Sequence, residues 1–287
     1  MIIDFHTHAF PDALAQRALD TLVAKAAQHA DIYGPSRTHT DGTYSGLAAS
    51  SAETGIDLSI LMPIATSVKP SARLNESAAE ADRFPGLRSF GSVHPMSPDA
   101  LAELEHIRAL GLRGIKLHPD YQDFFVDCDE SIAVIKRAYE LGLWVLLHAG
   151  EDIGFVPPFH CTPERIARMA EATNAADRVV LAHMGGYRLW DRALEVLPPL
   201  GLHIDTSNSV ELRHDQWPVF AELVRAFGSK RVLFGSDSPW ASQSAALCDT
   251  RRFLDEYGFS TEEQNDIFGN NAAKILGLMV QGDSCHA

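Results

Sequence analysis

The chain has 287 residues, 46% of them hydrophobic, and a formal net charge of −14. This length can bury a large core, and one α/β barrel domain of about 250 residues fits it as well as two smaller domains. The acidic balance argues against a nucleic-acid partner, because displacing counterions from a phosphate backbone needs a basic face. No apolar run reaches about 18 residues, so a membrane-spanning segment is not expected.

The cysteines are few and scattered. No C-x-x-C pair occurs, so neither a thiolate zinc site nor a disulfide framework is indicated. The chain also starts without a basic and then apolar leader. Together these features predict a reducing, cytoplasmic protein. The four cysteines are Cys128, Cys161, Cys248 and Cys285.

The first strand is predicted over residues 2–8, where apolar residues alternate with Asp4, His6 and His8. The two-residue period of a strand places these three polar side chains on one face. Two imidazoles on one face indicate a metal site, although a pair of core or surface histidines would give the same pattern.

The rest of the chain alternates between strand-like and helix-like segments. Seven further apolar runs predict strands over residues 58–63, 89–94, 114–118, 143–148, 179–183, 202–205 and 232–237. Helical spacing of apolar residues predicts helices that include 13–30, 98–110, 131–141, 163–172 and 217–227, and a final helix from about 260 to 278. Residues 31–50 are rich in Gly, Ser, Thr and Pro, and predict a long loop after the first strand.

Helix-end signals agree with this division. Thr162 before Pro163 is typical of an N-cap followed by proline in the first turn. Ser260 and Glu263 have the spacing of a capping box. Helix ends are predicted at Gly111, Gly142 and Gly228.

Eight strands that alternate with helices favour a closed (β/α)8 TIM barrel over an open sheet. One domain is predicted over residues 1–287. No G-x-G-x-x-G or P-loop follows a strand, which weakens nucleotide-binding alternatives.

Polar side chains end nearly every predicted strand. In a parallel barrel these strand ends meet on one face, where active sites of this architecture lie. One buried histidine alone is usually satisfied by a backbone hydrogen bond, but ionisable groups at the ends of several apolar runs are costly unless something binds there. Imidazoles and carboxylates without thiolates suit Zn²⁺, Mn²⁺ or Fe²⁺. The candidates are His6, His8, His94, Lys116, His118, His148, His183, Asp205 and Asp237.

Several motifs resemble the amidohydrolase superfamily, and within it the amidohydrolase-related group that includes aminocarboxymuconate semialdehyde decarboxylase. The resemblance covers nearly the whole chain and implies a TIM barrel. It rests on Asp-Phe-His6-Thr-His8, Leu-His148-Ala-Gly, Ala-His183-Met-Gly-Gly, Phe-Gly-Ser-Asp237-Ser-Pro-Trp and the closing segment 269–278.

The resemblance implies that His6, His8, His148 and Asp237 bind one divalent metal, with zinc preferred over manganese or iron. His183 would lie beside the metal-bound water. A metal lowers the pKa of its water to about 7, and Asp237 would accept the proton that this water loses. Asp237 and His183 are therefore the predicted catalytic residues.

Lys116, His118 and Trp240 are the predicted substrate-binding residues. Some superfamily members carry a carboxylated lysine near this place that bridges two metals. For Lys116 an ion pair with a carboxylate such as Asp4 is the simpler explanation. Arg37 could pair a substrate carboxylate, although a solvated loop arginine is the preferred explanation.

Three functions are compatible with these residues. A metal-dependent hydrolase of a small amide, lactone or ester is preferred, because few cationic residues offer a clamp for a substrate carboxylate. The alternative is a non-oxidative decarboxylase or hydratase of a carboxylated unsaturated or aromatic acid. A barrel that binds without turnover is the third. The expected partner is a small-molecule substrate, without nucleic acid or membrane, and a homodimer is the predicted assembly.

Overall fold

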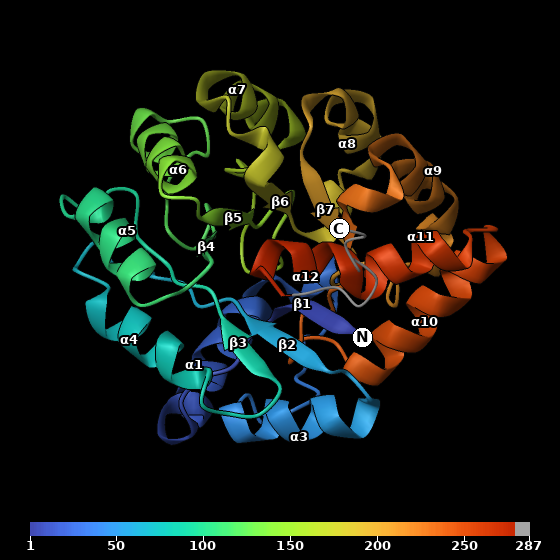
Figure 1. Cartoon of the computed structure of the whole chain (residues 1–287), viewed down its shortest axis with the longest axis horizontal. Coiled ribbons are helices and arrows are strands. Elements are labelled where there is room, and N and C mark those ends of the chain that lie inside the picture. The colour runs from blue at the N-terminus through green and yellow to red at the C-terminus, as the bar shows by residue number, and fades with distance from the viewer. Residues whose placement is uncertain (279–287) are drawn as a thin grey trace, which may run out of the picture.

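Eight short parallel strands follow one another around a ring in the computed structural model, which describes residues 1–278 (Figure 1). Each overlaps a predicted strand, although several end earlier than predicted. The strands are β1 (Ile3–Thr7), β2 (Leu58–Leu61), β3 (Leu87–Ser89), β4 (Gly114–Leu117), β5 (Trp144–Leu147), β6 (Val179–Leu181), β7 (His203–Asp205) and β8 (Val232–Leu233).

Main-chain hydrogen bonds close this ring. Regular pairing joins β1 to β3 and β4 to β8 in chain order. Between β3 and β4, the N–H of Lys116 donates to the carbonyl of Gly91 at 2.8 Å. Between β8 and β1, the N–H of Phe5 donates to the carbonyl of Phe234 at 2.8 Å, and that of His8 to Ser238 at 2.6 Å. The predicted (β/α)8 barrel is confirmed.

Helices surround the ring in Figure 1. The helices that follow β1 to β4 are α1 (Asp12–Ala26), α2 (Ala30–Tyr33), α3 (Tyr44–Thr54), α4 (Ala72–Ala81), α5 (Ala100–Ala109) and α6 (Asp129–Glu140). The remaining ones are α7 (Pro163–Thr173), α8 (Trp190–Val196), α9 (Trp217–Phe227), α10 (Gln243–Glu256), α11 (Thr261–Asn265) and α12 (Asn271–Leu276).

The predicted long loop over residues 31–50 is wrong for much of its length. It contains the end of α2 and the first half of α3, and the stretch between them covers residues 34–43. The Thr43 hydroxyl accepts a hydrogen bond from the N–H of Gly46 and caps α3. Tyr44, Leu47 and Ser51 are buried on one side of α3. Tertiary burial thus overrides the weak helix propensity of this Gly- and Ser-rich segment.

The final predicted helix is present but divided. Ser260 and Glu263 form the predicted capping box at α11. Residues Asp266–Asn270 are a π-helical segment between α11 and α12. The structure places Thr162 at the N-cap of α7 without a side-chain cap hydrogen bond.

The barrel interior is apolar at the end opposite the carboxyl ends of the strands. Ile3, Phe5, Phe90 and Leu146 share one buried cluster with side chains of α12. In Figure 1, α12 lies across the end of the barrel near the N-terminus. This packing closes one end of the barrel and leaves the opposite end to the polar side chains.

A β-bulge in β1 changes the predicted alternation. The pairing of β1 with β2 shifts register between Asp4 and Thr7. Asp4 accepts hydrogen bonds from Ser236 and from Gln243 of α10, and Gln243 also bonds Ser51 of α3. Asp4 therefore points toward the outer helices. The prediction that it shares a face with both histidines is wrong, because a bulge inserts one residue into the two-residue period.

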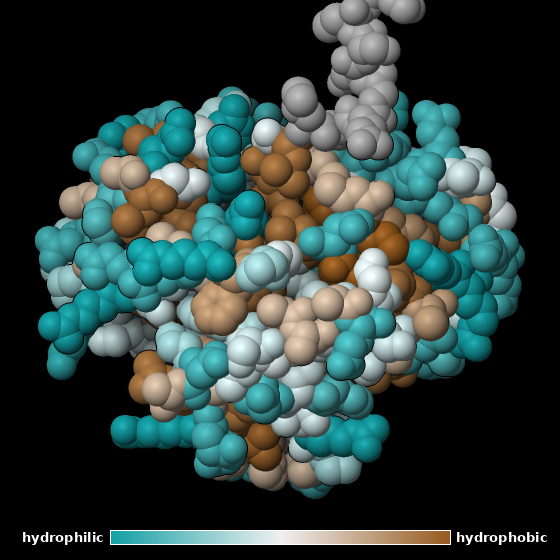
Figure 2. Space-filling model, turned by 60° about the horizontal axis from the view of Figure 1, so that its bottom comes forward, coloured by the Kyte–Doolittle hydropathy of each residue, from teal (hydrophilic) through white to brown (hydrophobic). Residues whose placement is uncertain are grey.

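Hydrophobic surface in the view of Figure 2 is broken into separate areas among hydrophilic side chains. Among the described residues, no helix is long and apolar enough to cross a bilayer. The described cysteines Cys128, Cys161 and Cys248 are free, whereas Cys285 lies outside the described residues. One domain over 1–287 and a homodimer both stay predictions.

Candidate active site

Most predicted site residues meet where the strands end at their carboxyl side. Several strands end before their predicted polar residue, so those residues lie just beyond the strand. All are buried except His8, which is partly exposed. The residues found there are His6, His8, Lys116, His118, His148, His183, Asp205 and Asp237.

Three potential metal ligands converge at the end of β1, and we call them the first donor group (His6, His8 and Asp237). The Nε2 atoms of the two imidazoles are 3.2 Å apart. The Oδ1 atom of Asp237 lies 3.2 Å from His8 Nε2 and 3.6 Å from His6 Nε2. The main chain of Asp237 is tied to β1, because its N–H donates to the carbonyl of His6 at 2.8 Å.

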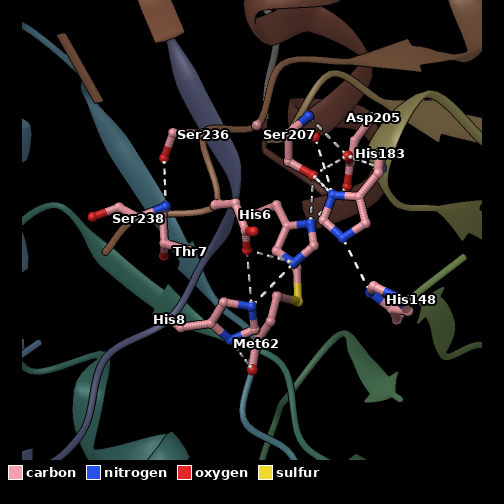
Figure 3. A network of polar contacts seen from close by, with 12 residues as sticks. His6, Thr7, His8, Met62, His148, His183, Asp205, Ser207, Ser236 and Ser238 are labelled. Carbon is pink, nitrogen blue, oxygen red and sulfur yellow. Dashed lines mark hydrogen bonds and ion pairs between the residues drawn. The ribbon is translucent and has the colours of Figure 1, made fainter. Parts of the chain in front are cut away.

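The opposite ring nitrogens explain why this group suits a metal. His6 Nδ1 contacts the carboxylate of Asp205 at 2.9 Å, and His8 Nδ1 contacts the carbonyl of Met62 at 2.9 Å (Figure 3). Both partners only accept, so each imidazole carries its proton on Nδ1. Both Nε2 lone pairs then face each other and the carboxylate of Asp237. Such hydrogen bonds fix metal-binding imidazoles in proteins, and three ligands leave a position open for water or substrate.

Burial favours the protonation states that a metal requires. Desolvation, with the nearby Lys116 ammonium, holds the pKa of His6 well below its usual value. Burial alone would raise the pKa of Asp237, but contacts with His8, His6 and His183 keep that pKa below its usual value. The site thus combines the neutral imidazole of His6 with an ionised carboxylate, which suits a divalent ion.

Lys116 is almost fully buried beside this group. Its Nζ lies 3.1 Å from His6 Nε2, and burial lowers its pKa to about 8. The suggested ion pair with Asp4 is not formed, because Asp4 bonds Ser236 and Gln243 instead. Lys116 is therefore an amine donor beside the candidate metal ligands.

His183 is held by the loop that follows β7. Its Nδ1 lies 3.0 Å from both the hydroxyl and the carbonyl oxygen of Ser207. The main-chain N–H groups of His183 and Ser207 both donate to Asp205 Oδ1 at 3.0 Å. His6, His183 and Asp205 form a further cluster of donor atoms. The Nδ1 atoms of both histidines in this cluster already make hydrogen bonds. We therefore interpret the cluster as hydrogen bonding that holds the two imidazole rings in place.

His148 does not join the first donor group. Its Nδ1 contacts His183 Nε2 at 3.1 Å (Figure 3). It belongs instead to the second donor group (His118, His148 and Asp152). His118 and His148 stack with ring centroids 4.0 Å apart and an angle of 9° between the rings. Asp152 Oδ2 lies 3.2 Å from His118 Nε2 and 3.8 Å from His148 Nε2.

Three other predicted residues contribute no ligand atom to these groups. Trp240 is half-buried in the turn after Asp237, to whose carbonyl its N–H donates at 2.9 Å. Arg37 is exposed. His94 lies beyond the end of β3, and its Nδ1 accepts from the N–H of Met96 at 3.3 Å.

A family model described as Amidohydrolase matches residues 3–278. The chain belongs to the amidohydrolase family. The match spans both donor groups and every strand of the barrel, so the predicted resemblance is confirmed. A comparison with curated protein sequences finds no significant match.

Solved structures of amidohydrolase proteins share the fold of this chain at low sequence identity. The 5-carboxyvanillate decarboxylase of Sphingomonas paucimobilis has a TM-score of 0.71 and 19% identity over 97% of this chain and 99% of that one. A 5-carboxyvanillate decarboxylase of Novosphingobium aromaticivorans was solved with manganese and 4-hydroxy-3-methoxy-5-nitrobenzoic acid. It has a TM-score of 0.69 and 17% identity over 97% of this chain and 96% of that one. A probable 2-pyrone-4,6-dicarboxylic acid hydrolase of Acinetobacter baumannii has a TM-score of 0.63 and 16% identity over 96% of this chain and 99% of that one.

Sequence reasoning missed two residues of this site. Asp152 follows His148 by four residues in the loop after β5, and a carboxylate so close after a strand-end histidine was a usable signal. Ser207 was not recognisable, because its hydroxyl bonds residues that are distant in sequence, including His6 at 3.0 Å.

Proposed function

We propose that this amidohydrolase is a metal-dependent decarboxylase of a carboxylated aromatic or unsaturated acid. The observation that supports it best is the Lys116 amine, 3.1 Å from His6 within the first donor group. An ammonium next to a divalent ion attracts a carboxylate far more strongly in a buried site than in water. The sequence favoured hydrolysis because few cationic residues offered a clamp for a substrate carboxylate, and Lys116, one of those few, is buried beside the first donor group.

The relatives support the same choice. Decarboxylases of carboxylated aromatic acids are among the solved structures that share the fold, and one of them was solved with manganese and a nitrobenzoic acid. At such low sequence identity the similarity supports the fold alone, so the reaction of this chain is a proposal.

The first donor group would hold the metal ion. When bound, the ion supplies a positive charge that polarises a substrate oxygen or acidifies a bound water. Both Nε2 atoms are free of protons and Asp237 is ionised, so the donor set fits zinc or manganese. His148, the predicted fourth ligand, is left out of this set because its ring nitrogens face His183 and the loop after β5.

The side chains have distinct roles in this proposal. Lys116 binds the substrate carboxylate, and His118 lies on the same side of the site. Loss of CO₂ leaves an electron pair on carbon, which must take up a proton. Asp237, ionised in the free chain, would first take a proton from water and then deliver it to that carbon, while His183, held by Ser207, would orient the substrate.

A hydrolase of a lactone, ester or amide is the second candidate. Asp237 would then accept the proton of an attacking water. The fold shared with a probable pyrone dicarboxylic acid hydrolase favours including it.

The test is a parallel assay of the metal-loaded chain on carboxylated hydroxybenzoates, measuring CO₂ release, and on lactones and amides, measuring acid release. We expect CO₂ release, and a rise in KM of at least about tenfold for Lys116→Met. The matched control is Lys136→Met, since Lys136 lies in α6 outside the site. Acid release without CO₂ release would replace the decarboxylase with the hydrolase.

A further inference from the structure

The polar end of the barrel is largely closed to solvent. Apart from the partly exposed His8, the side chains that meet there are between 0% and 6% exposed. A substrate has to touch groups of this kind, so part of the chain must move before a substrate can enter. The buried residues include His6, Lys116, His118, His148, His183 and Asp237.

The segment after β1 is held by few buried side chains. Among residues 12–33, which form α1, a short turn and α2, only Ala15, Leu19 and Ala26 are buried. By comparison, six of the 11 residues of α9 are buried. Leu19 lies against Gly42, which belongs to the same excursion from the barrel. A segment with so little buried apolar contact can open at low cost.

The ends of this segment are fixed, whereas its middle projects from the barrel. The N–H of Phe10 donates to the carbonyl of Gly42 at 2.8 Å, so the chain leaves and rejoins the barrel at one place. The N–H of His39 donates to the carbonyl of Pro239 at 2.7 Å. Gly34 directly follows α2 with φ +83°, and nothing lies within 4 Å of an added Cβ there. This glycine can therefore act as a hinge.

Lys25 ties α1 to the loops after β4 and β5. Its Nζ lies 3.7 Å from the ring centroid of Phe155 and 5.0 Å from that of Tyr121. The two rings meet edge to face with centroids 5.0 Å apart. Tyr121 also packs edge-on against His118, at 4.7 Å between ring centroids. The cation is attracted to the aromatic faces, so α1 is held directly beside a histidine of the site.

Tyr33 ties α2 to the loops after β5 and β6. Its hydroxyl donates to the carboxylate of Glu151 at 3.3 Å. The Arg188 guanidinium lies 5.0 Å from the Tyr33 ring centroid, and its Nε is 3.6 Å from Glu151 Oε2. All three side chains are at least partly exposed. Polar contacts between such side chains are weak, so this tie can break and form again.

We propose that residues 12–33 are a lid over the active site, which Lys25 and Tyr33 hold closed and which opens to admit the substrate. The lid touches the loops after β4, β5 and β6, each of which begins with a histidine of the site. Such a lid serves decarboxylation and hydrolysis alike, because either substrate must reach the same buried residues.

The test measures how fast a reagent reaches the buried histidines. The metal-loaded full-length chain is treated with diethyl pyrocarbonate, and mass spectrometry follows the modification of His118 and His183. We expect Lys25→Met to make both react about two- to fivefold faster, because one cation–π contact is lost. The amides of residues 12–33 should exchange hydrogen faster in the same variant, while those of the strands keep their rate. Tyr33→Phe, which removes only a hydroxyl, should act in the same direction.

Two controls accompany these variants. Lys25→Arg keeps a cation over the rings and should keep the wild-type rates, as should Lys136→Met at an exposed position of α6. The exposed His214 should react equally fast in every protein. Unchanged modification of the buried histidines in Lys25→Met and Tyr33→Phe would overturn the lid, even if residues 12–33 exchanged faster. Faster exchange throughout the barrel in both variants would overturn it too, because unfolding would then expose the histidines.

Discussion

Asp205 controls which nitrogen of His6 can bind a metal. Its Oδ1 accepts hydrogen bonds from the N–H groups of His183 and Ser207 and from the Ser207 hydroxyl. Its Oδ2 accepts from His6 Nδ1. One carboxylate thus orients an imidazole of the first donor group and also the ring beside it.

We expect Asp205→Asn to lower metal affinity about 10- to 100-fold. The three donors that now bond Oδ1 will hold the amide oxygen in that position, so the amide N–H₂ group will face His6 Nδ1. The proton of His6 must then move from Nδ1 to Nε2, which is the ligand atom. Competition with a coloured chelator measures the affinity. Asp191→Asn, an exposed carboxylate in α8, is the control. Equal affinity in the Asp205 variant and the wild type would contradict this role.

His203 makes stability depend on pH at a position remote from the site. Its ring packs edge-on against Trp144 at 5.1 Å, and its buried Nδ1 lacks a partner among the described residues. Burial, helped by Arg231, lowers its pKa from 6.5 to about 4. Between these values the unfolded chain binds a proton that the folded chain does not, so stability is lost as pH falls.

We expect this histidine to remove about 2 to 3 kcal/mol of the free energy of unfolding between pH 6.5 and pH 4. The variant His203→Phe keeps a ring against Trp144 and cannot titrate. Urea denaturation across this pH range should therefore show a steeper acid loss for the wild type than for the variant. Parallel curves would mean that His203 is protonated in the folded chain. His29→Phe, at a partly exposed position, should leave the slope unchanged.

The loop after β5 positions the second donor group through Gly150. This glycine lies between His148 and Asp152 with φ +90°, and an added Cβ would meet the main-chain nitrogen of Tyr187 at 2.2 Å. Its N–H donates to the carbonyl of Cys161 at 2.9 Å. A side chain here cannot be accommodated unless the loops after β5 and β6 separate.

Gly150→Ala should therefore destabilise the fold more than the same change at a glycine with open surroundings. Gly201 has φ +84° and nothing within 4 Å of an added Cβ, so Gly201→Ala should cost about 1 to 2 kcal/mol. We expect Gly150→Ala to cost at least about 2 kcal/mol more. Urea denaturation of both variants measures the difference, and similar losses would show that the loops can move apart freely.

At the scale of the whole molecule, metal binding should be linked to barrel stability. The first donor group joins β1 to the end of β8, where main-chain bonds close the ring. An ion that binds the folded chain alone stabilises it by about 2.7 kcal/mol at 100 times its Kd. We expect Zn²⁺ to raise the Tm of the wild type, and EDTA to reverse the rise.

The double variant Asp152→Asn and Asp237→Asn is the control for this linkage, because it lacks a carboxylate in each donor group. Its Tm should respond to Zn²⁺ far less than that of the wild type. An equal rise in both proteins would show that the stabilising ion binds elsewhere.

The strand order, the barrel and the identity of the polar residues at its open end could all be predicted from the sequence. Short apolar runs that end in histidine or aspartate carry this information, because parallel strands bring their carboxyl ends to one place. The first donor group was predicted residue by residue, and so were the helix ends at Gly111, Gly142 and Gly228, each with positive φ.

Only the tertiary structure shows which of these polar residues lie together and which of them point away from the site. The bulge in β1 turns Asp4 away from His6, and no local pattern announces it. His148, predicted as a ligand of the same ion as His6, has its donor atoms close to those of His118 and Asp152, and its role as a ligand stays a prediction. The proton positions depend on pairs such as His6 with Asp205, which are 199 residues apart. Local sequence sets the period and the ends of elements, whereas contacts across a closed barrel exist only after every strand has taken its place.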